Sequence, residues 1–402
     1  MPPLSTIPKF IGYFLANRNI IKKTPKPYQI TFSVTTACQS LCKSCNIGLE
    51  YQKNPASAKD DLTLEEIEKM FKSIGPVYFF NISGGEPYLR SDLPQIVELA
   101  CKYLKPRVIH TPTNALTPGI IERKTREIME IIKKYDPTVP YTIKPSFDGY
   151  GTKHDELRGV KGNFDKLNDT YKRLKILQKD YPNLHVGLGT VISKNNLDVI
   201  KETVDYALSL EPDTYINEVA EERSEMFNNS SITPSAEEYK KATDYFSQEV
   251  SKKIKNKSGL SRITQAFRLV YYDLTVDILK TKSQVIPCYA STISAHINAK
   301  GQVWACSILA YDKPMGDIRQ AGYDFYKVWY SDQAEKVRKS IRNRECACPM
   351  ANAAYYNMML HPPSVLKAVK YFLFPNSYKR TNSLEKNNSK IEDKIDIAIE
   401  SD

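Results

Sequence analysis

Residues 29–45 read QITFSVTTACQSLCKSC and place three cysteines directly after a segment typical of a buried strand. The first seven residues are rich in β-branched and aromatic types, which strands favour. Cys38, Cys42 and Cys45 follow at C-x-x-x-C-x-x-C spacing, so their thiols can converge on one soft metal centre. Three thiols leave one iron of an iron–sulfur cluster open to another ligand, and no nearby histidine completes a zinc site. The stretch therefore predicts a metal centre at the end of a strand.

The alternation of strand and helix continues along the chain to residue 219. Strand patterns recur at 29–35, 77–82, 107–111, 141–147, 184–192 and 213–219. Helical patterns lie between them at 63–73, 92–104, 118–134, 163–180 and 196–209. These repeats predict an α/β fold with a parallel sheet covered by helices. Periodicity leaves open whether the sheet lies flat or curls into an open barrel.

Polar residues gather at the expected carboxyl ends of these strands. The turn 83–87, Ser-Gly-Gly-Glu-Pro, follows the second strand, where glycines let a ligand approach the backbone and Glu86 can accept from an ammonium group. Other strand ends carry Asn114, Ser146, Asp148 and Glu218. Because ligands bind at this edge of parallel sheets, we predict that the active face lies here. For each residue alone, an ordinary turn or helix cap is the competing interpretation.

A second group of cysteines lies in the C-terminal part of the chain. Its members are Cys288, Cys306, Cys346 and Cys348. Segments 293–298 and 302–306 alternate around Lys300-Gly301 and predict a hairpin. Four thiols can complete an iron–sulfur cluster without an external ligand, or they can hold structural zinc. The eighth cysteine, Cys101, lies in an apolar helical pattern and is expected to be buried.

The order of these motifs resembles the radical S-adenosylmethionine (SAM) superfamily over roughly residues 28–220. The resemblance rests on the three-cysteine motif after the first strand and the Gly-Gly-Glu-Pro turn after the second. It implies a partial (β/α)6 TIM-like barrel. It also implies that Cys38, Cys42 and Cys45 hold a 4Fe–4S cluster whose open iron is chelated by SAM.

The same resemblance implies which residues bind SAM. Gly84, Gly85 and Glu86 would meet its amino group, and Asn114 and Ser146 are candidates for its ribose or carboxylate. One departure is Ser44, which stands where an aromatic residue is common in this family. The adenine would then be held by other groups, such as Ile47 or Leu49.

The C-terminal cysteines resemble the auxiliary-cluster domain called twitch, a shortened relative of the SPASM domain. This implies a small C-terminal α+β domain with a second 4Fe–4S cluster, and zinc stays open as the alternative. The expected organisation is a basic amphipathic segment (1–27), a radical SAM core (28–234), linking helices (235–284), an auxiliary-cluster domain (285–360), a second basic amphipathic segment (361–380) and a disordered tail (381–402).

The net charge is +11, and basic residues concentrate at the two ends. Segments 6–23 and 364–375 are amphipathic, so they either contact an anionic membrane surface or cap the barrel with Phe10, Phe14, Tyr371 and Phe372. With no visible signal peptide or spanning stretch, we expect a cytoplasmic protein, with peripheral membrane association as the variant. No nucleic-acid partner is expected. The histidines show no metal-ligand spacing and are expected to be structural.

The resemblance implies an enzyme that cleaves SAM reductively to a 5′-deoxyadenosyl radical, which abstracts hydrogen from a substrate. An electron donor such as ferredoxin or flavodoxin is the implied partner. Asp148 and Glu218 are candidates for substrate contact or proton transfer. The basic ends favour a lipid or a membrane-linked glycan as substrate, and a peptide is the alternative. A non-catalytic electron carrier and a zinc-stabilised interaction protein are the further alternatives.

Overall fold

The computed structural model describes residues 7–228, 232–254 and 259–377, so the tail expected at 381–402 lies outside the described residues. The strands are β1 (Gln29–Ser33), β2 (Phe79–Ser83), β3 (Val108–Thr113), β4 (Tyr141–Pro145), β5 (Leu184–Val186), β6 (Leu188–Ile192), β7 (Tyr215–Val219), β8 (Ser294–Ile297), β9 (Gln302–Trp304) and β10 (Gly316–Asp317).

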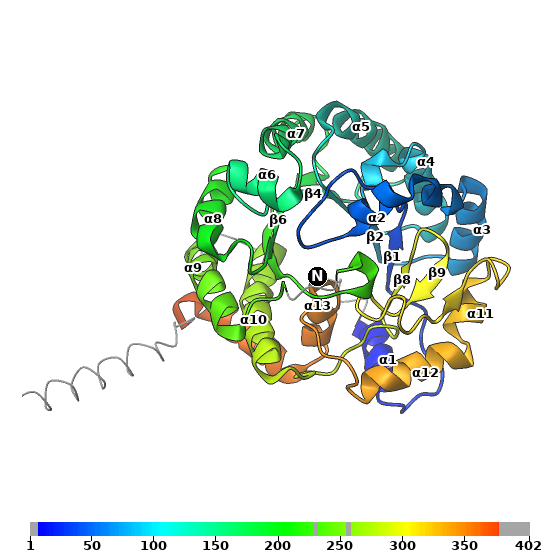
Figure 1. Ribbon diagram of the computed structural model, residues 1–402. Helices are drawn as coiled ribbons and strands as arrows, with labels where there is room; N and C mark the ends of the chain where they lie inside the picture. Colours follow the sequence, from blue (N-terminus) through cyan, green and yellow to red (C-terminus); the bar gives the residue numbers. More distant parts are fainter. Residues whose placement is uncertain (1–6, 229–231, 255–258, 378–402) are drawn as a thin grey trace, which may run out of the picture.

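The strands of the first half form a curved parallel sheet. β1 to β5 lie side by side in chain order, and β6 pairs with β7. Figure 1 shows them around a central space, with helices on the outside. The α/β fold with a partial TIM-like barrel is therefore confirmed.

Successive side chains of the barrel strands point alternately outward, into the hydrophobic core, and inward, to the central space. Phe32 of β1 and Phe80 of β2 point outward and pack edge-on against Phe71, with ring centroids 5.8 and 5.5 Å apart. Burying each such ring contributes roughly 1.5–3 kcal/mol. Their neighbours Thr31 and Asn81 face the inside of the barrel, because successive side chains of a strand point to opposite faces.

The prediction of a single strand at 184–192 is wrong, because Gly187 interrupts it and separates β5 from β6. The N–H of Gly187 donates to the carbonyl of Ile143 over 2.8 Å, which completes the pairing of β5 with β4. The next residues then pair with β7 instead. The N–H of Phe147 donates to the carbonyl of Gly189 over 2.7 Å, which keeps the barrel wall continuous beyond β4.

The C-terminal hairpin exists, and it extends the barrel sheet. β8 pairs parallel with β1, and β9 and β10 follow antiparallel, giving the order β10-β9-β8-β1. A second connection joins Glu66 to Arg319, whose Nε donates to Oε1 over 2.7 Å. The two halves of the chain therefore share one sheet.

Most helices lie where the sequence predicts them. They are α1 (Ile7–Asn17), α2 (Ile47–Lys53), α3 (Leu64–Ile74), α4 (Leu93–Leu99), α5 (Pro118–Tyr135), α6 (Thr152–Arg158), α7 (Asn163–Leu177), α8 (Ile200–Ser209), α9 (Ala236–Ile254), α10 (Gly259–Thr281), α11 (Phe325–Trp329), α12 (Asp332–Arg342), α13 (Ala351–Met359) and α14 (Pro362–Leu373). The short helices α2 and α6 and the C-terminal helices α11, α12 and α13 were not predicted. α4 ends in a π-helical turn at Ala100–Leu104 that holds the partly buried Cys101.

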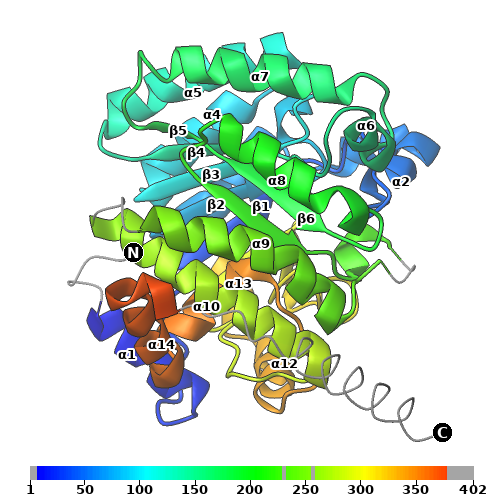
Figure 2. The same cartoon turned by 90° about the vertical axis from the view of Figure 1, so that its left-hand side faces the viewer.

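The two ends of the described chain meet outside the barrel. Figure 2 shows α1 and α14 side by side beneath α10. In the part of the chain that the structure describes, every helix is too short or too polar to span a bilayer.

Candidate active site

A cavity of about 260 Å³ fills the inside of the barrel at the carboxyl ends of the strands. Its wall includes a hydrogen-bonded row across three strands. Nδ1 of His110 lies 2.7 Å from Oδ1 of Asn81, whose Nδ2 donates to Oγ1 of Thr31 over 3.3 Å. Burial lowers the pKa of His110 to about 3, so this imidazole is neutral at physiological pH.

Cys38, Cys42 and Cys45 lie on a loop that closes one end of the cavity. The end of α6 holds this loop from outside. The N–H of Leu41 donates to the carbonyl of Arg158 over 3.1 Å, and the N–H of Lys43 donates to the carbonyl of Leu157 over 2.9 Å. The loop is therefore fixed at Leu41 and Lys43 by a segment more than a hundred residues away.

The turn after β2 packs directly onto the cysteine loop. Gly84 has φ +123°, a conformation that favours glycine, and a Cβ on Gly85 would lie 2.3 Å from the carbonyl oxygen of Ala37 and 2.9 Å from Cβ of Cys38. Only residues without side chains fit this contact. The Gly-Gly pair therefore places the backbone of the turn against the first cysteine.

Glu86 is buried beside this turn, and its carboxylate accepts three bonds. The donors are the N–H of Tyr88 (3.1 Å), the hydroxyl of Thr113 (2.9 Å) and the N–H of Asn114 (2.6 Å). Burial raises the pKa of Glu86, and it outweighs these hydrogen bonds, which lower the pKa. A carboxylate has about four acceptor positions, so one position stays available for a ligand in the cavity.

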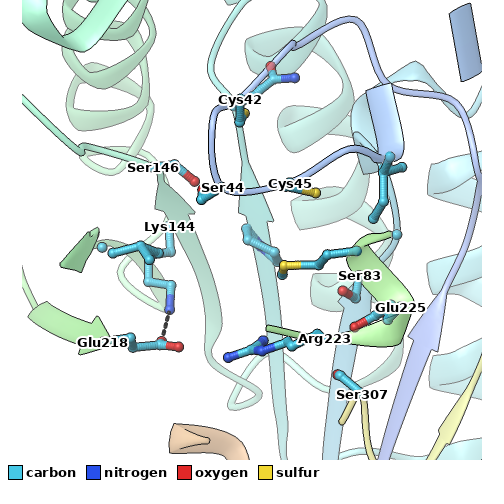
Figure 3. Close-up of a pocket in the computed structure, with 18 of the residues that line it drawn as sticks. Cys42, Ser44, Cys45, Ser83, Lys144, Ser146, Glu218, Arg223, Glu225 and Ser307 are labelled. Carbon is cyan, nitrogen blue, oxygen red and sulfur yellow. Dashed lines mark hydrogen bonds and ion pairs between the residues drawn. The ribbon is translucent and has the colours of Figure 1, made fainter. Parts of the chain in front are cut away.

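Asn114 and Ser146 both line the cavity. The side-chain amide of Asn114 donates to Oε1 of Gln39 over 3.1 Å and lies 4.0 Å from the sulfur of Cys38. Ser146 lies opposite Ser44 in Figure 3. Ile47 lines the cavity, whereas Leu49 is exposed on α2, so of these two side chains only Ile47 can meet a ligand there.

Asp148 lies behind the cavity wall. One carboxylate oxygen accepts from Nη1 of Arg158 over 3.0 Å, and the other accepts from the N–H of Val191 over 2.8 Å. The guanidinium of Arg158 lines the cavity beside Cys42 and Cys38. Asp148 therefore orients an arginine that faces the thiols.

The first thiol set fits an iron–sulfur cluster. Burial raises the pKa of Cys38 to about 11 and that of Cys45 to about 12, and the charges of the other thiols add to both shifts. Metal ligands must be deprotonated, so the set needs a compensating positive charge. Arg158 supplies one, and its Nε is buried without a partner among the described residues.

The second thiol set consists of Cys288, Cys306, Cys346 and Cys348. Burial raises the pKa of Cys306 to about 12 and that of Cys346 to about 11, and neighbouring thiols of the set raise both further. Four interacting thiols, one of them buried and three partly buried, suit a cluster with no exchangeable ligand. Across the described ranges, no three His, Cys, Asp or Glu side chains converge on a single ion position.

Charged side chains form the cavity wall between the two thiol sets. Nζ of Lys144 lies 3.1 Å from Oε1 of Glu218, and Nη2 of Arg223 lies 2.7 Å from Oε2 of Glu221. Figure 3 shows Lys144 and Glu218 pointing toward each other below the cysteine loop. Burial pushes the pKa of Glu218 upward, but Lys144 and Arg223 outweigh burial and hold it below its ordinary value.

Several of these wall residues were missed by the sequence analysis. They are Lys144, Glu221, Arg223, Glu225, His110 and His296. Two of the histidines that were expected to be structural, His110 and His296, thus lie in the cavity wall. Lys144 and His110 could have been found from the sequence, because Lys144 lies two residues before Ser146 and His110 four residues before Asn114. An even spacing along a strand places side chains on the same face. Nothing local marked the segment after β7.

That segment bridges the two halves of the site. The N–H of Asn46 donates to the carbonyl of Met226 over 2.8 Å, next to the cysteine loop. On the other side, Phe227 stacks on Tyr311 with ring centroids 5.4 Å apart, and Glu225 lies 3.5 Å from His296. Residues 220–228 thus lie over the cavity and contact both thiol-bearing regions.

Comparison with known proteins identifies both regions. Residues 32–207 match the Radical SAM superfamily model, and residues 288–349 match the SPASM iron-sulfur cluster-binding domain. The chain therefore contains a radical SAM domain followed by a SPASM domain. Radical SAM enzymes use a 4Fe–4S cluster and SAM, and the SPASM domain binds auxiliary iron–sulfur clusters. When bound, the first cluster supplies the electron that cleaves SAM to a hydrogen-abstracting 5′-deoxyadenosyl radical.

Two curated relatives align with most of the chain at low sequence identity. AdoMet-dependent heme synthase of Methanosarcina barkeri is 24% identical over 331 residues, covering 80% of this chain and 86% of that protein. Mycofactocin maturase MftC of Mycolicibacterium smegmatis is 22% identical over 337 residues, covering 82% and 76%. The solved structure of anSMEcpe with bound AdoMet and Cp18Cys peptide superposes with a TM-score of 0.56 at 15% identity, covering 88% of this chain and 100% of that one. The structural likeness shows the shared fold.

Proposed function

We propose that this radical SAM enzyme modifies a peptide that enters the cavity between the two thiol sets. The observation that carries the proposal is the charged wall made by the pairs Lys144–Glu218 and Arg223–Glu221. Buried charges are costly beside an acyl chain, whereas peptide groups can hydrogen-bond to them. MftC is a maturase, and anSMEcpe was solved with a peptide, which supports the same choice. An acyl chain has no such support in the cavity wall. Between a glycan and a peptide, the maturase relative and the peptide-bound structure favour the peptide.

The proposed roles follow the geometry. Cys38, Cys42 and Cys45 would hold the SAM-binding cluster, and Cys288, Cys306, Cys346 and Cys348 the auxiliary one. Gly84, Gly85, Glu86, Asn114 and Ser146 would bind SAM. The first three cysteines and the five SAM-binding candidates line one cavity, which favours their assignment. The second thiol set interacts electrostatically with Glu221 of the cavity wall.

The two carboxylates named from the sequence take different proposed roles. Glu218 faces the cavity, so it is the candidate for substrate contact. Asp148 does not reach the cavity, and we propose that it is a positioning residue that acts through Arg158. The division at residues 28–234 and 285–360 is likewise proposed for the two cluster-bearing domains.

A one-electron donor must reduce the first cluster. We propose a small acidic carrier such as a ferredoxin or flavodoxin, because the net charge of +11 favours an acidic partner. Reduction by such a carrier should slow steeply with added salt, whereas reduction by dithionite, a small inorganic reductant, should not.

The substrate class can be tested by isotope transfer. Cells that produce the protein are grown in deuterated medium, and their peptide, lipid and pigment fractions are offered to reconstituted enzyme with unlabelled SAM. Hydrogen abstraction transfers deuterium from the substrate into 5′-deoxyadenosine. We expect deuterium from the peptide fraction, lost after digestion of that fraction with protease.

Two outcomes would contradict the peptide assignment. Deuterium arriving from the solvent-extracted lipid fraction would restore the lipid or glycan substrate. Deuterium from a protease-resistant pigment fraction would favour a tetrapyrrole, in line with the heme synthase relative. Glu218→Gln is the matched variant, because it should reduce transfer from the true fraction while leaving the iron content unchanged.

A further inference from the structure

The two ends of the described chain build an apolar groove of about 1020 Å³ on the outside of the barrel. Figure 2 shows α1 and α14 forming this end of the molecule, with α10 above them. The groove is lined almost entirely by apolar side chains, from α1 (Phe10, Ile11, Phe14), α10 (Ile263, Phe267) and the α13–α14 region (Leu360, Val365, Leu366, Val369, Leu373). A contiguous apolar surface of this kind marks an interaction site.

The helices that form the groove are firmly packed on the protein. Phe10 packs edge-on against Tyr28 with ring centroids 5.3 Å apart, and the hydroxyl of Tyr371 donates to Asp273 over 2.8 Å. The barrel-capping interpretation of the two basic segments therefore holds for one face of each helix. The other face stays open, since Leu366 is 70%, Leu373 56% and Ile11 54% exposed.

The two segments that carry this open face are basic. Residues 7–27 and 361–377 contain no acidic residue, and Lys9, Arg18, Lys22 and Lys370 are exposed there. Lys367 is already paired with Asp273 over 2.7 Å, so it adds little. The charge of the rim favours an anionic partner over a second copy of this basic surface.

We propose that the groove face of α1 and α14 binds an anionic lipid bilayer surface. The exposed apolar side chains would enter the acyl boundary, and the lysines and arginine would meet the headgroup phosphates, as amphipathic helices do at membrane interfaces. The inference is independent of the peptide assignment, because it concerns a surface remote from the cavity.

The orientation of this surface follows from the packing of α1. Phe10 and Phe14 pack on a cluster that contains Tyr28 and Ile293, the residues that directly precede β1 and β8. The groove therefore lies toward the amino ends of the strands, whereas Cys38, Cys42 and Cys45 follow the carboxyl end of β1. A bilayer bound here holds the enzyme with its cavity facing water, so the groove is an anchor and not a substrate entrance.

The test is co-sedimentation of the full-length reconstituted enzyme with vesicles of phosphatidylcholine alone or with 30% phosphatidylglycerol (a composition of roughly this order gives a strongly anionic surface). We expect binding to the anionic vesicles, weakened by salt. The double variant Leu366→Glu, Leu373→Glu should bind at least about tenfold more weakly. Ile176→Glu is the matched control, because Ile176 is 56% exposed on α7, and it should bind like the parent.

Four results would overturn the proposal. The parent could fail to bind anionic vesicles, or the double variant could bind as well as the parent. A dimer of the parent that the double variant abolishes, without vesicle binding, would assign the face to a second copy. Binding by residues 1–377 alone, but not by the full chain, would assign it to residues 378–402. Melting temperature and iron content of the double variant, expected to equal those of the parent, separate loss of binding from loss of folding.

Discussion

The guanidinium of Arg158 donates to the carboxylate of Asp148 over 3.0 Å, and both side chains are almost withdrawn from water. Asp148 follows β4, while Arg158 ends α6, whose last carbonyls accept from the cysteine loop. This pair therefore connects the barrel wall to the loop that carries the first thiol set, and it aims a positive charge at Cys42.

Replacing Arg158 with methionine should lower the free energy of unfolding by about 3–5 kcal/mol, because Asp148 is left buried without its partner. Urea unfolding of the reconstituted protein measures the change. Lys43→Met is the control, since its pair with Glu156 is exposed and should cost at most about 1 kcal/mol. Equal losses in the two variants would contradict a special role for the buried pair.

Replacing Gly85 with alanine should weaken SAM binding at least about tenfold, because a Cβ 2.3 Å from the carbonyl of Ala37 forces the turn away from the cysteine loop. Equilibrium dialysis with labelled SAM measures the affinity. Gly119→Ala is the control: Gly119 lies in α5 with no atom within 4 Å of an added Cβ, so this variant should bind normally. Unchanged SAM binding by the Gly85 variant would argue against the proposed contact.

The contact between Glu66 and Arg319 should make stability depend on pH. The hydrogen bonds from Arg319, followed by those from Thr63 and Tyr323, lower the pKa of Glu66 from its ordinary value of 4.5 to about 2. Burial raises this pKa, but the hydrogen bonds outweigh it. A carboxyl group with a lowered pKa stabilises the fold above pH 4.5 and loses this contribution as the pH falls through about 2.

Glu66→Gln should accordingly melt about 2 °C or more below the parent at pH 7, and the gap should narrow between pH 4.5 and 2. Differential scanning fluorimetry across this range measures it. Glu65→Gln provides the control, because that side chain is 76% exposed and pairs only at the surface with Lys69. A gap that stays constant with pH would contradict the assignment of the effect to ionised Glu66.

Metal content should separate the two thiol sets. After anaerobic reconstitution we expect about eight irons per chain, falling to about four when Cys38, Cys42 and Cys45 are all changed to alanine. Cys101→Ala should keep all eight, since this thiol belongs to neither set. Four irons plus one zinc in the parent would assign zinc to the C-terminal thiols and leave the first site intact.

Much of the fold was predictable because its signals are local. Each strand of the barrel carries its own β-branched run, and each helix its own apolar stripe, so element order followed from short windows of sequence. The break at Gly187 was not predictable in this way. The residues on both sides of it favour a strand, and only the separate partners β4 and β7 divide them.

The sequence by itself indicated the chemistry, because each motif is local: three thiols stand at a fixed spacing, and the Gly-Gly-Glu-Pro turn directly follows its own strand. Tertiary structure alone decided which charges surround that chemistry. Arg223 and Glu221 reach the cavity because the segment after β7 folds back over the cysteine loop, and His296 reaches it because β8 pairs with β1. Such contacts join residues hundreds of positions apart, and no periodic pattern along a chain records which distant partner a side chain will meet.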